Sequence, residues 1–512
     1  MAFLKISSIL TLNRLQTVAA CLLLIIIIFW WSVKLDVLPG LHGDEAWAGL
    51  NALKINSEGL KSLMGMNNYT GALQPLLAAV AFKLLGAGVY QLRIVGVLFN
   101  CISMLLIAYV CIKYKLIKNL YIFFLLMGQA ALFIVSPRIA WEVNSLTLLF
   151  TVISFLSLFI IYNKRSNITF YALLFWIANI LGSYNHVIFS SLGVALFMGL
   201  TIWMLYQDDQ NFWKLTVVCG VNMINLVALF LITKYYAPLL TTHNLFEIFL
   251  LIATILLIEA LLLNNITQIK IQYSVLPDWT IRVLMVLFAI CFLYHHGIAF
   301  YDLLSNYKIY THVYSWQGSI VITVLQSAWG AIILLYLAYS CYSAIINKSQ
   351  YRVLAIILIV YCGILPLYTT SCSFRYYLIL YVTAAIYLSL HNESNNVLSR
   401  VFKYGLLLNF CITNLILISI FQQDRALKAI EINIGNHQTE TSAHFLPNKP
   451  LMDFLRDNEI DTITFFSDRY FLEQPIIFLK KLHPWTIHNG TNAIVDYDYS
   501  DNLHGGYLFQ KK

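Results

Sequence analysis

Apolar runs recur along most of the chain, and short polar segments separate them. A run of about 20 residues crosses roughly 30 Å of hydrocarbon as a helix. Because a backbone in lipid must satisfy its own hydrogen bonds, repeated runs of this kind predict a bundle of membrane-spanning helices. We expect about thirteen spans. They lie near residues 15–34, 90–112, 120–136, 145–162, 168–184, 187–206, 215–233, 246–263, 283–300, 319–342, 353–369, 377–390 and 404–421.

The first apolar run, at 15–34, could be a cleaved signal peptide. Lys5 and Arg14 precede it, but no small-residue cleavage site follows it. Phe29, Trp30 and Trp31 are typical of the aromatic belt at a membrane surface. We therefore interpret the run as a retained first span.

Residues 423–512 have a different pattern. LMDFLRDNEI predicts an amphipathic helix, DTITFFS a strand and QPIIFLKKL a second helix. DYDYSDNLHGGYLFQ predicts a hairpin or edge strands. The fold expected is therefore an all-α polytopic membrane domain over 1–422, followed by a small α/β domain over 423–512 outside the membrane.

The composition agrees with a membrane protein. Of the 512 residues, 60% are hydrophobic and 11% are charged, whereas soluble domains have about 25% charged residues. The nine cysteines fall in or beside apolar runs, with Cys372 near an outer end, and no C-x-x-C occurs. This pattern does not predict a disulfide framework.

The formal net charge of +8 does not indicate nucleic-acid binding, because the cations divide between alternate loops. With the N-terminus inside, the inner segments hold Lys5, Arg14, Lys113, Lys115, Lys118, Lys164, Arg165, Lys214, Lys270, Arg282, Lys348, Arg352, Arg400 and Lys403. The short outer loops from the third span onward hold Arg138, Lys234, Lys308 and Arg375. Since Lys and Arg mark the cytoplasmic side, we expect a multi-pass protein of the cytoplasmic (inner) membrane. Its first loop and C-terminal region would lie on the periplasmic or outer side.

The first outer loop, residues 35–89, is far longer than a simple connector. AWAGLNALKINSEGL places Trp47, Leu50 and Leu53 on one helical face and polar residues on the other, which predicts a helix in the interface plane. GALQPLLAAVAFKLLGAG is apolar but interrupted early by Pro75, so it is a second interfacial helix or a short span. We favour the interfacial helix, because a span here would put the loop and the C-terminal region on opposite sides.

Asp44 and Glu45 are adjacent carboxylates in this loop, within GDEAWAG. An x-x-QP turn, KLLG and the arginine of VYQLRIVGVLFN follow them. SPRIAWEVN precedes the fourth span, and SFRYYLILY opens the twelfth. In their order, spacing and sidedness, these motifs resemble the family 39 glycosyltransferases of the GT-C class, akin to protein O-mannosyltransferases and the lipid A aminoarabinose transferase. The resemblance covers essentially the whole chain.

The resemblance implies transfer of a sugar from a polyprenyl-phosphate carrier to a lipid, glycan or protein acceptor at the outer face. The leaving lipid phosphate departs as an anion, so no protonating acid is required, unlike glycoside hydrolysis with its two carboxylates. One carboxylate must take the proton of the acceptor hydroxyl. One or more cations must stabilise the charge that develops on the phosphate. A single displacement of this kind inverts the anomeric centre.

Asp44 matches the family's catalytic aspartate, and the role expected of it is general base. Glu45 matches the partner of that aspartate, which orients the acceptor or the first loop helix. The alternative is that Asp44 caps a helix beginning near Ala46, a common use of aspartate.

Glu142 and His186 lie in outer turns. Glu142 resembles an acidic residue of the family that faces the same cavity, where it would position the acceptor or a metal. The alternative is a pair with Arg138 on one helix turn. His186, in GSYNHVIFS near Tyr184, stands where family members often carry a polar or basic residue, and its alternative is a solvated histidine.

Arg375 and Tyr376 match an Arg-Tyr pair at the outer start of a span. An arginine there can hold a phosphate bidentately, and the alternative is an arginine that snorkels to the headgroups. Arg93 matches the family's arginine opening the span after the loop. For Arg93, contact with the donor phosphate and structural pairing with the loop helices stay equally open.

One position departs from relatives of the aminoarabinose-transferase type. Gln74 stands before Pro75, where those relatives carry a basic residue. The change removes a positive charge near the expected donor phosphate, and Lys83 lies two to three helix turns away.

No metal or other cofactor is indicated. His295 and His296 are adjacent, so they point apart on a helix, and neither they nor His42 complete an H-x-x-x-H motif or a carboxylate triad.

Three other functions are alternatives. A transporter or flippase would carry ionisable residues within its spans and short, symmetric pairs of Gly- or Pro-interrupted spans. The ionisable residues are very few here, and no such pairs stand out as inverted repeats. A glycan polymerase or ligase acts through a long loop late in the chain, whereas the long loops here are the first one and the one around 300–318. A non-catalytic membrane scaffold for the outer domain would not need Asp44.

Overall fold

The structure is a computed structural model. It describes residues 2–67, 69–163, 167–206, 210–235, 245–266, 277–314, 316, 318–347, 349, 351–369, 373–391 and 397–422. In the C-terminal region it describes 428–429, 433–434, 437–438, 445–446, 460–465, 469–482, 491–498 and 505–511.

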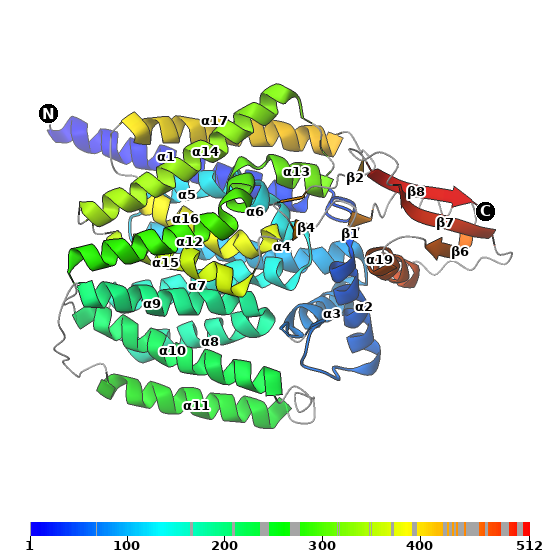
Figure 1. Ribbon diagram of the computed structural model, residues 1–512, viewed down its shortest axis with the longest axis horizontal. Coiled ribbons are helices and arrows are strands. Elements are labelled where there is room, and N and C mark those ends of the chain that lie inside the picture. Colours follow the sequence, from blue (N-terminus) through cyan, green and yellow to red (C-terminus); the bar gives the residue numbers. More distant parts are fainter. Residues whose placement is uncertain are drawn as a thin grey trace.

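A bundle of helices makes up most of the described chain (Figure 1). Its helices are α1 (Ala2–Ser32), α4 (Val89–Lys113), α5 (Ile117–Gly128), α6 (Ala131–Val135), α7 (Glu142–Asn163), α8 (Ile168–Asn185), α9 (Ser190–Tyr206), α10 (Gln210–Tyr235), α11 (Leu245–Ile266), α12 (Asp278–Ser305), α13 (Tyr307–Tyr314), α14 (Ile320–Ile346), α15 (Arg352–Tyr368), α16 (Leu378–His391) and α17 (Val397–Gln422). Short 3-10 helices are η1 (Ser136–Arg138), η2 (Val187–Phe189) and η5 (Phe374–Tyr377). The N-terminus lies at one end of the bundle, and the first loop lies at the other end with the C-terminal strands (Figure 1).

Within the described residues, nine helices are long and apolar enough to cross a membrane, or ten if the bent pair α5–α6 counts as one span. The nine are α1, α4, α7, α8, α9 with η2, α10, α12, α14 and α17. The other predicted runs coincide with α11, α15 and α16, of which α15 has 17 residues and α16 has 14. The chain is therefore a multi-pass membrane protein, and the count of thirteen spans stays a prediction.

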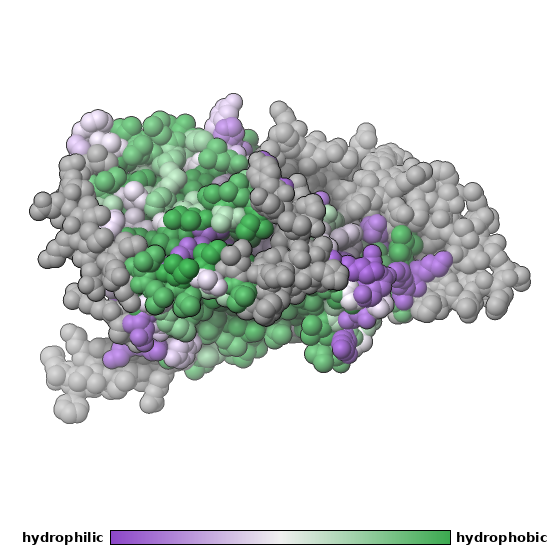
Figure 2. Space-filling view, turned by 90° about the horizontal axis from the view of Figure 1, so that it is seen from below, coloured by the Kyte–Doolittle hydropathy of each residue, from purple (hydrophilic) through white to green (hydrophobic). Residues whose placement is uncertain are grey.

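The surface of the bundle is suited to lipid. Figure 2 shows hydrophobic residues over most of its coloured area and hydrophilic residues mainly towards the ends. Large apolar side chains such as Leu261, Leu293 and Val324 are exposed. A soluble protein rarely exposes a continuous apolar surface of this extent.

The run at 120–136, predicted as one span, is broken. α5 and α6 meet at an angle of 78°. At the break, the side-chain carbonyl of Gln129 accepts hydrogen bonds from Trp329 Nε1, at 2.8 Å, and from Asn409 Nδ2. The Gln129 amide donates to the Tyr381 hydroxyl at 2.9 Å, and Asn306 Nδ2 donates to the Gln129 backbone carbonyl at 2.9 Å. The bond to the Gln129 backbone carbonyl, together with the Ala131 N–H donated to Asn306 Oδ1 at 2.8 Å, replaces helical bonds lost at the break. The other bonds satisfy the Gln129 side chain in an apolar interior that offers no water.

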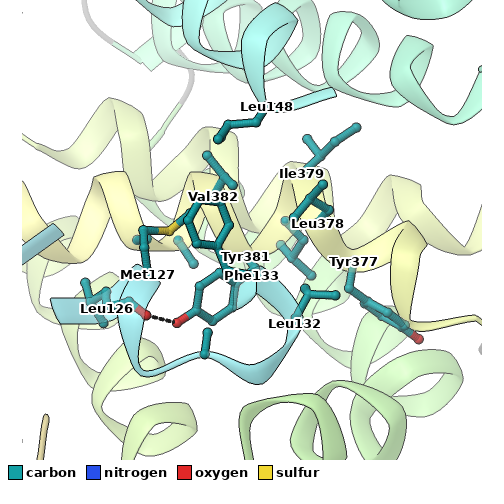
Figure 3. Close-up of a cluster of buried hydrophobic side chains, with 14 of the residues drawn as sticks. Leu126, Met127, Leu132, Phe133, Leu148, Tyr377, Leu378, Ile379, Tyr381 and Val382 are labelled. Carbon is teal, nitrogen blue, oxygen red and sulfur yellow. Dashed lines mark hydrogen bonds between the residues drawn. The ribbon is translucent and has the colours of Figure 1, made fainter. Parts of the chain in front are cut away.

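The broken span also holds the segment that carries Arg375. Figure 3 shows side chains of α5 and α6 packed against η5 and α16, among them Leu126, Phe133, Tyr377 and Tyr381. The Tyr381 hydroxyl donates to the Leu126 carbonyl at 2.5 Å. All four side chains are buried, so η5 rests on a packed part of the core.

The first loop folds into α2 (Gly43–Glu58) and α3 (Leu73–Leu85). α3 has 13 residues, a length of about 20 Å, which favours the interfacial helix over a span. The buried residues of α2 are Gly43, Glu45, Ala46, Ala48, Gly49 and Ala52. The predicted apolar face of Trp47, Leu50 and Leu53 is partly buried, as a helix in the interface plane allows, and the sequence did not indicate the buried face of small residues. The small residues are buried because two helices, α3 and α19 (Arg469–Leu482), pack against α2.

The described strands of the C-terminal region form a four-stranded sheet in the order β2–β8–β7–β6. These strands are β2 (Lys428–Ala429), β6 (Ile460–Phe465), β7 (Thr491–Asp498) and β8 (Gly505–Lys511), and α19 connects the parallel pair β6–β7. The strand at DTITFFS, the helix at QPIIFLKKL and an antiparallel pair at the C-terminal end are present. The predicted helix at LMDFLRDNEI lies outside the described residues, and the independence of a domain over 423–512 stays a prediction.

Short strands complete the fold. β3 (Asn433–Ile434) pairs with β4 (His437–Gln438). β5 (Phe445–Leu446) pairs antiparallel with β1 (Leu41–His42), which directly precedes α2. The C-terminal region therefore contacts the first loop at the place where the two carboxylates stand.

Candidate active site

Asp44 lies in the first turn of α2, facing an arginine from the far end of the sequence. The N-cap of α2 is His42, whose Nδ1 accepts the Asp44 backbone N–H at 3.1 Å. The Asp44 side chain is therefore not the cap, and that alternative is wrong. Instead, Arg375 Nη1 donates to Asp44 Oδ2 at 3.2 Å, and both side chains are 11% exposed.

Aromatic rings surround Arg375, which η5 positions at the start of α16. Its guanidinium lies over the ring of Trp141, 4.6 Å from the centroid, and over that of Tyr376 at 5.3 Å. Trp141 in turn donates from Nε1 to His42 Nδ1 at 3.2 Å. Stacking on aromatic faces orients a guanidinium and shields it from water.

Glu142 opens α7 beside this pair and is half-buried. Its carboxylate interacts electrostatically with both Arg375 and Asp44. The expected alternative, a pair with Arg138, is wrong. The Arg138 guanidinium donates to Trp30 O, and to Val33 O at 2.8 Å.

Arg138 has a structural role that the sequence did not indicate. It is fully buried, and it also donates to the carbonyls of Lys34 and Leu38 at 3.1 and 2.6 Å. Carbonyls at the C-terminal end of a helix have no partner within the helix. Arg138 therefore holds the end of α1 and the chain that follows it.

Glu45 and Arg93 form a closed ion pair directly behind Asp44. Arg93 Nε and Nη2 donate to the Glu45 carboxylate at 2.6 and 2.8 Å, and both side chains are 0% exposed. Arg93 also donates to the carbonyls of Leu35 and Pro39, both at 2.9 Å, and of Gly40 at 2.8 Å. A guanidinium has five N–H donors, and these five bonds use all of them.

This geometry bears on the roles predicted for Arg93 and Glu45. Arg93 has no donor left for a phosphate, so the structural alternative for Arg93 holds. Glu45 also accepts the backbone N–H of Ala140 at 3.0 Å and of His42 at 3.4 Å. Its carboxylate is therefore committed to fixing the first turn of α2 rather than to an acceptor.

His186 lies between α8 and α9, close to Arg375. Its Nδ1 accepts the Ile188 backbone N–H at 3.1 Å, so in the neutral ring Nε2 carries the proton. Within the described chain His186 Nε2 is buried and has no hydrogen-bond partner. The His186 ring packs against Tyr376 and Tyr69 at centroid distances of 5.6 and 5.4 Å. Burial, and then the charge of Arg375, lower the pKa of His186 to about 3, so the ring stays neutral.

An apolar cavity opens beside His186. Its volume is about 620 Å³. Tyr69 and Thr70 from the first loop, Tyr184 and Val187 from the α8–α9 turn, and Phe230 from α10 are among the side chains that line it. Gln74, the position that departs from the expected basic residue, is buried at the start of α3.

The three histidines that were considered as metal ligands have different contacts. His296 is buried against the Tyr377 hydroxyl at 2.6 Å, whereas His295 is exposed. His42 belongs to the Asp44 group. Among the residues that the structure describes, no three His, Cys, Asp or Glu side chains form a group that could hold a metal ion.

The structure thus brings Asp44, Glu142, His186, Arg375 and Tyr376 to one end of the bundle. Sequence reasoning missed Trp141 and the capping role of His42. The signal for Trp141 was its place directly before Glu142 in SPRIAWEVN, and the signal for His42 was its place two residues before Asp44.

No protein-family model matches the chain, and no curated protein matches it. Among solved structures, the chain is similar to ArnT from Cupriavidus metallidurans, a lipid A aminoarabinose transferase, in the apo state, with 11% identity and a TM-score of 0.37. The similarity covers 94% of this chain and 93% of ArnT. ArnT bound to undecaprenyl phosphate has 12% identity and a TM-score of 0.38.

The chain is also similar to the oligosaccharyltransferase from Archaeoglobus fulgidus in a complex with Zn and sulfate, with 12% identity and a TM-score of 0.41. That similarity covers 79% of this chain and 53% of the oligosaccharyltransferase, so the chain spans about half its length. Both solved proteins are GT-C glycosyltransferases.

Proposed function

We propose that this protein transfers a sugar from a polyprenyl-phosphate carrier to an acceptor at the outer face of the cytoplasmic membrane, with inversion. One observation carries the proposal: Asp44 faces Arg375 at 3.2 Å, and Glu142 and His186 lie in electrostatic or ring contact with Arg375 and Tyr376. A base and an anion-binding group thus meet at the end of a membrane bundle, where a lipid headgroup can reach them.

Asp44 acts as the general base. It takes the proton of the acceptor hydroxyl while the hydroxyl oxygen attacks the anomeric carbon and the bond from that carbon to the phosphate oxygen breaks. General base catalysis of this kind contributes typically 10²–10⁴-fold. The lipid phosphate leaves with the bonding electron pair, and attack opposite the leaving group inverts the anomeric centre.

Arg375 binds the phosphate of the donor and stabilises the charge that develops on it. A guanidinium presents five donors in a fixed fork, so a phosphate oxygen can be bound beside a carboxylate. Tyr376 and Trp141 hold the plane of the guanidinium. Positioned donors of this kind cost no reorganisation during the reaction.

Glu142 and His186 orient the substrates. The Glu142 carboxylate accepts hydrogen bonds from hydroxyl groups of the sugar or of the acceptor substrate, on the side of Asp44. His186 is a neutral donor through Nε2, since its low pKa keeps it uncharged. The cavity beside it is apolar, and its volume of about 620 Å³ can hold part of a polyprenyl chain.

The test is a transfer assay with the purified full-length chain in proteoliposomes. Undecaprenyl phosphate carrying radiolabelled aminoarabinose, mannose or glucose is supplied with lipid A, an oligosaccharide or a peptide as acceptor. We expect label in one acceptor class and an inverted anomeric configuration by NMR. Label that crosses the bilayer still attached to its carrier, with no transfer to any acceptor, would instead establish a flippase.

A further inference from the structure

The C-terminal region contacts the strand that leads into the catalytic turn. β5 pairs antiparallel with β1, so that Leu41 lies opposite Leu446 and His42 lies opposite Phe445. His42 then accepts the backbone N–H of Asp44 through Nδ1 at 3.1 Å. Backbone pairing with β5 is thus two residues away from the proposed base.

A second contact holds the body of α2. Phe478 of α19 is 0% exposed and lies against Gly49, so close that a Cβ on Gly49 would be 2.6 Å from the Phe478 ring. On the α3 side, Phe82 stacks on Phe478 with a centroid distance of 6.3 Å. α2 is therefore enclosed between α3 and α19, with the ring of Phe478 seated on a glycine.

These contacts form a core of their own. Ile476, Phe478 and Leu479 of α19 are buried with small residues of α2 and with Ala140. The Ala140 backbone N–H donates to Glu45, the neighbour of Asp44. The cluster is separate from the main core of the bundle and also holds Val89 and Leu92 of α4, so α2 is packed between residues of the first span after the loop and residues of α19.

We propose that β5 and α19 are positioning elements of the active site, which hold α2 so that Asp44 stays within reach of Arg375. The inference rests on the proposed function, because it assigns a catalytic consequence to the position of Asp44. Phe478 acts through α2 and touches no substrate. Its loss moves the base away from the acceptor while the phosphate site on η5 stays in place.

The first experiment separates catalysis from binding. Phe478→Ala is compared with wild type in the transfer assay and in binding of undecaprenyl phosphate alone. We expect kcat to fall roughly 10²-fold, because a displacement of about 1 Å has that effect, with KM for the donor and the affinity for undecaprenyl phosphate unchanged. Ile477→Ala, at an exposed position on the same helix, is the matched control and should leave kcat unchanged. An unchanged kcat in Phe478→Ala would overturn the proposal.

The second experiment tests the contact itself by suppression. Gly49→Ala places a methyl group 2.6 Å from the Phe478 ring, so α2 must shift and kcat should fall. Phe478→Leu removes the ring, and the double variant should recover most of the lost rate, which is the coupling expected of residues in contact. Gly220→Ala, where the nearest atom lies 3.4 Å from the added carbon, is the control. If the double variant is no faster than Gly49→Ala, the proposal fails.

The third experiment distinguishes failure of the positioning role from failure of the proposed function. Residues directly opposite in an antiparallel pair have Cα atoms about 4.5–5.5 Å apart, a distance that a disulfide can bridge. The full-length Leu41→Cys/Leu446→Cys variant should cross-link on oxidation, as seen by mass spectrometry, and absence of the cross-link would refute the role of β5. A wild type that transfers no sugar refutes the proposed function, whereas a wild type that transfers sugar at a rate that Phe478→Ala leaves unchanged refutes the positioning role.

Discussion

Asp44 and Glu45 are neighbours in the chain, and each faces an arginine from a distant element, yet the two pairs differ in kind. Glu45 and Arg93 are both 0% exposed and share bonds of 2.6 and 2.8 Å. Asp44 and Arg375 are each 11% exposed and share a contact of 3.2 Å. A pair whose donors are all engaged can only stabilise a fold, whereas a looser pair with access to solvent can exchange partners with a substrate. We expect the two carboxylates to respond differently to the same isosteric substitution.

The largest effect is expected from Asp44→Asn. The amide keeps the shape of the carboxylate but cannot accept a proton, so the transfer rate should fall by roughly 10²–10⁴-fold. Expression, thermal stability and binding of undecaprenyl phosphate should stay at wild-type values, which is measured on the same detergent-purified samples. Asp44→Glu should also lose about 10²-fold, because the added methylene displaces the carboxylate. Transfer at the wild-type rate in Asp44→Asn would show that Asp44 is not the general base.

The next effect is on stability and is expected from Glu45→Gln. Removing one partner of a buried ion pair leaves the other charge uncompensated, at a cost of about 3–5 kcal/mol. The variant should therefore unfold at a clearly lower temperature in detergent. Glu58→Gln, which breaks the exposed pair with Lys61, is the matched control and should not change the unfolding temperature. Equal unfolding temperatures for Glu45→Gln and wild type would show that Arg93 does not depend on Glu45.

A smaller effect on catalysis is expected from Arg375→Lys. Lysine keeps the positive charge but loses the planar fork and its stacking on Trp141 and Tyr376. Transfer should fall by about 10²-fold, with a higher KM for the donor and an unchanged unfolding temperature. Arg93→Lys should show the reverse pattern, with lower stability and no separate effect on KM. Full activity in Arg375→Lys would argue against bidentate phosphate binding.

The smallest effect is a pH dependence from His186. Its folded pKa of about 3 lies below the ordinary value of 6.5, so below that value the unfolded chain takes up a proton that the folded chain does not. The stabilising contribution is complete above about pH 6.5 and is lost as the pH falls towards 3. Between pH 7.5 and 5.5 the free energy of unfolding should drop by about 1 kcal/mol.

His186→Asn should remove that part of the pH dependence, and thermal unfolding at the two pH values measures it. A variant with the same slope as wild type would show that His186 is not buried as a neutral ring. The pH profile of transfer by the wild type should also lack a limb near pH 6.5, since a ring with a pKa of about 3 does not titrate there.

The sequence predicted which residues form the candidate site better than it predicted the contacts among them. Five of the seven assigned residues, Asp44, Glu142, His186, Arg375 and Tyr376, lie together. Glu45 and Arg93 lie directly behind them as a buried pair. A motif records which side chains occur near a span end, but it does not record whether their hydrogen-bonding groups are already used. Arg93 matched a family arginine as Arg375 did, but its five donors are all engaged within the protein.

The broken span and the loop helix show the same limit in the fold. Residues 122–135 are apolar throughout except for Gln129, and the bend of 78° depends on partners from the turn after α12 and from α14, α16 and α17. In α2, the sequence indicated the apolar face of Trp47, Leu50 and Leu53 but not the buried face, which the small residues form. The small face is the buried one because Phe478, more than 400 positions away, is seated on Gly49.

The sequence by itself determined what depends on local periodicity and composition. Apolar runs of membrane-spanning length require helices, because lipid offers no partner for the backbone, and the distribution of Lys and Arg predicts their orientation. It also placed two carboxylates together after the first span. Only the tertiary structure decided which arginine each carboxylate meets. Those partners lie 331 and 48 positions away, and packing between distant segments brings them together and sets how much of each pair remains open to a substrate.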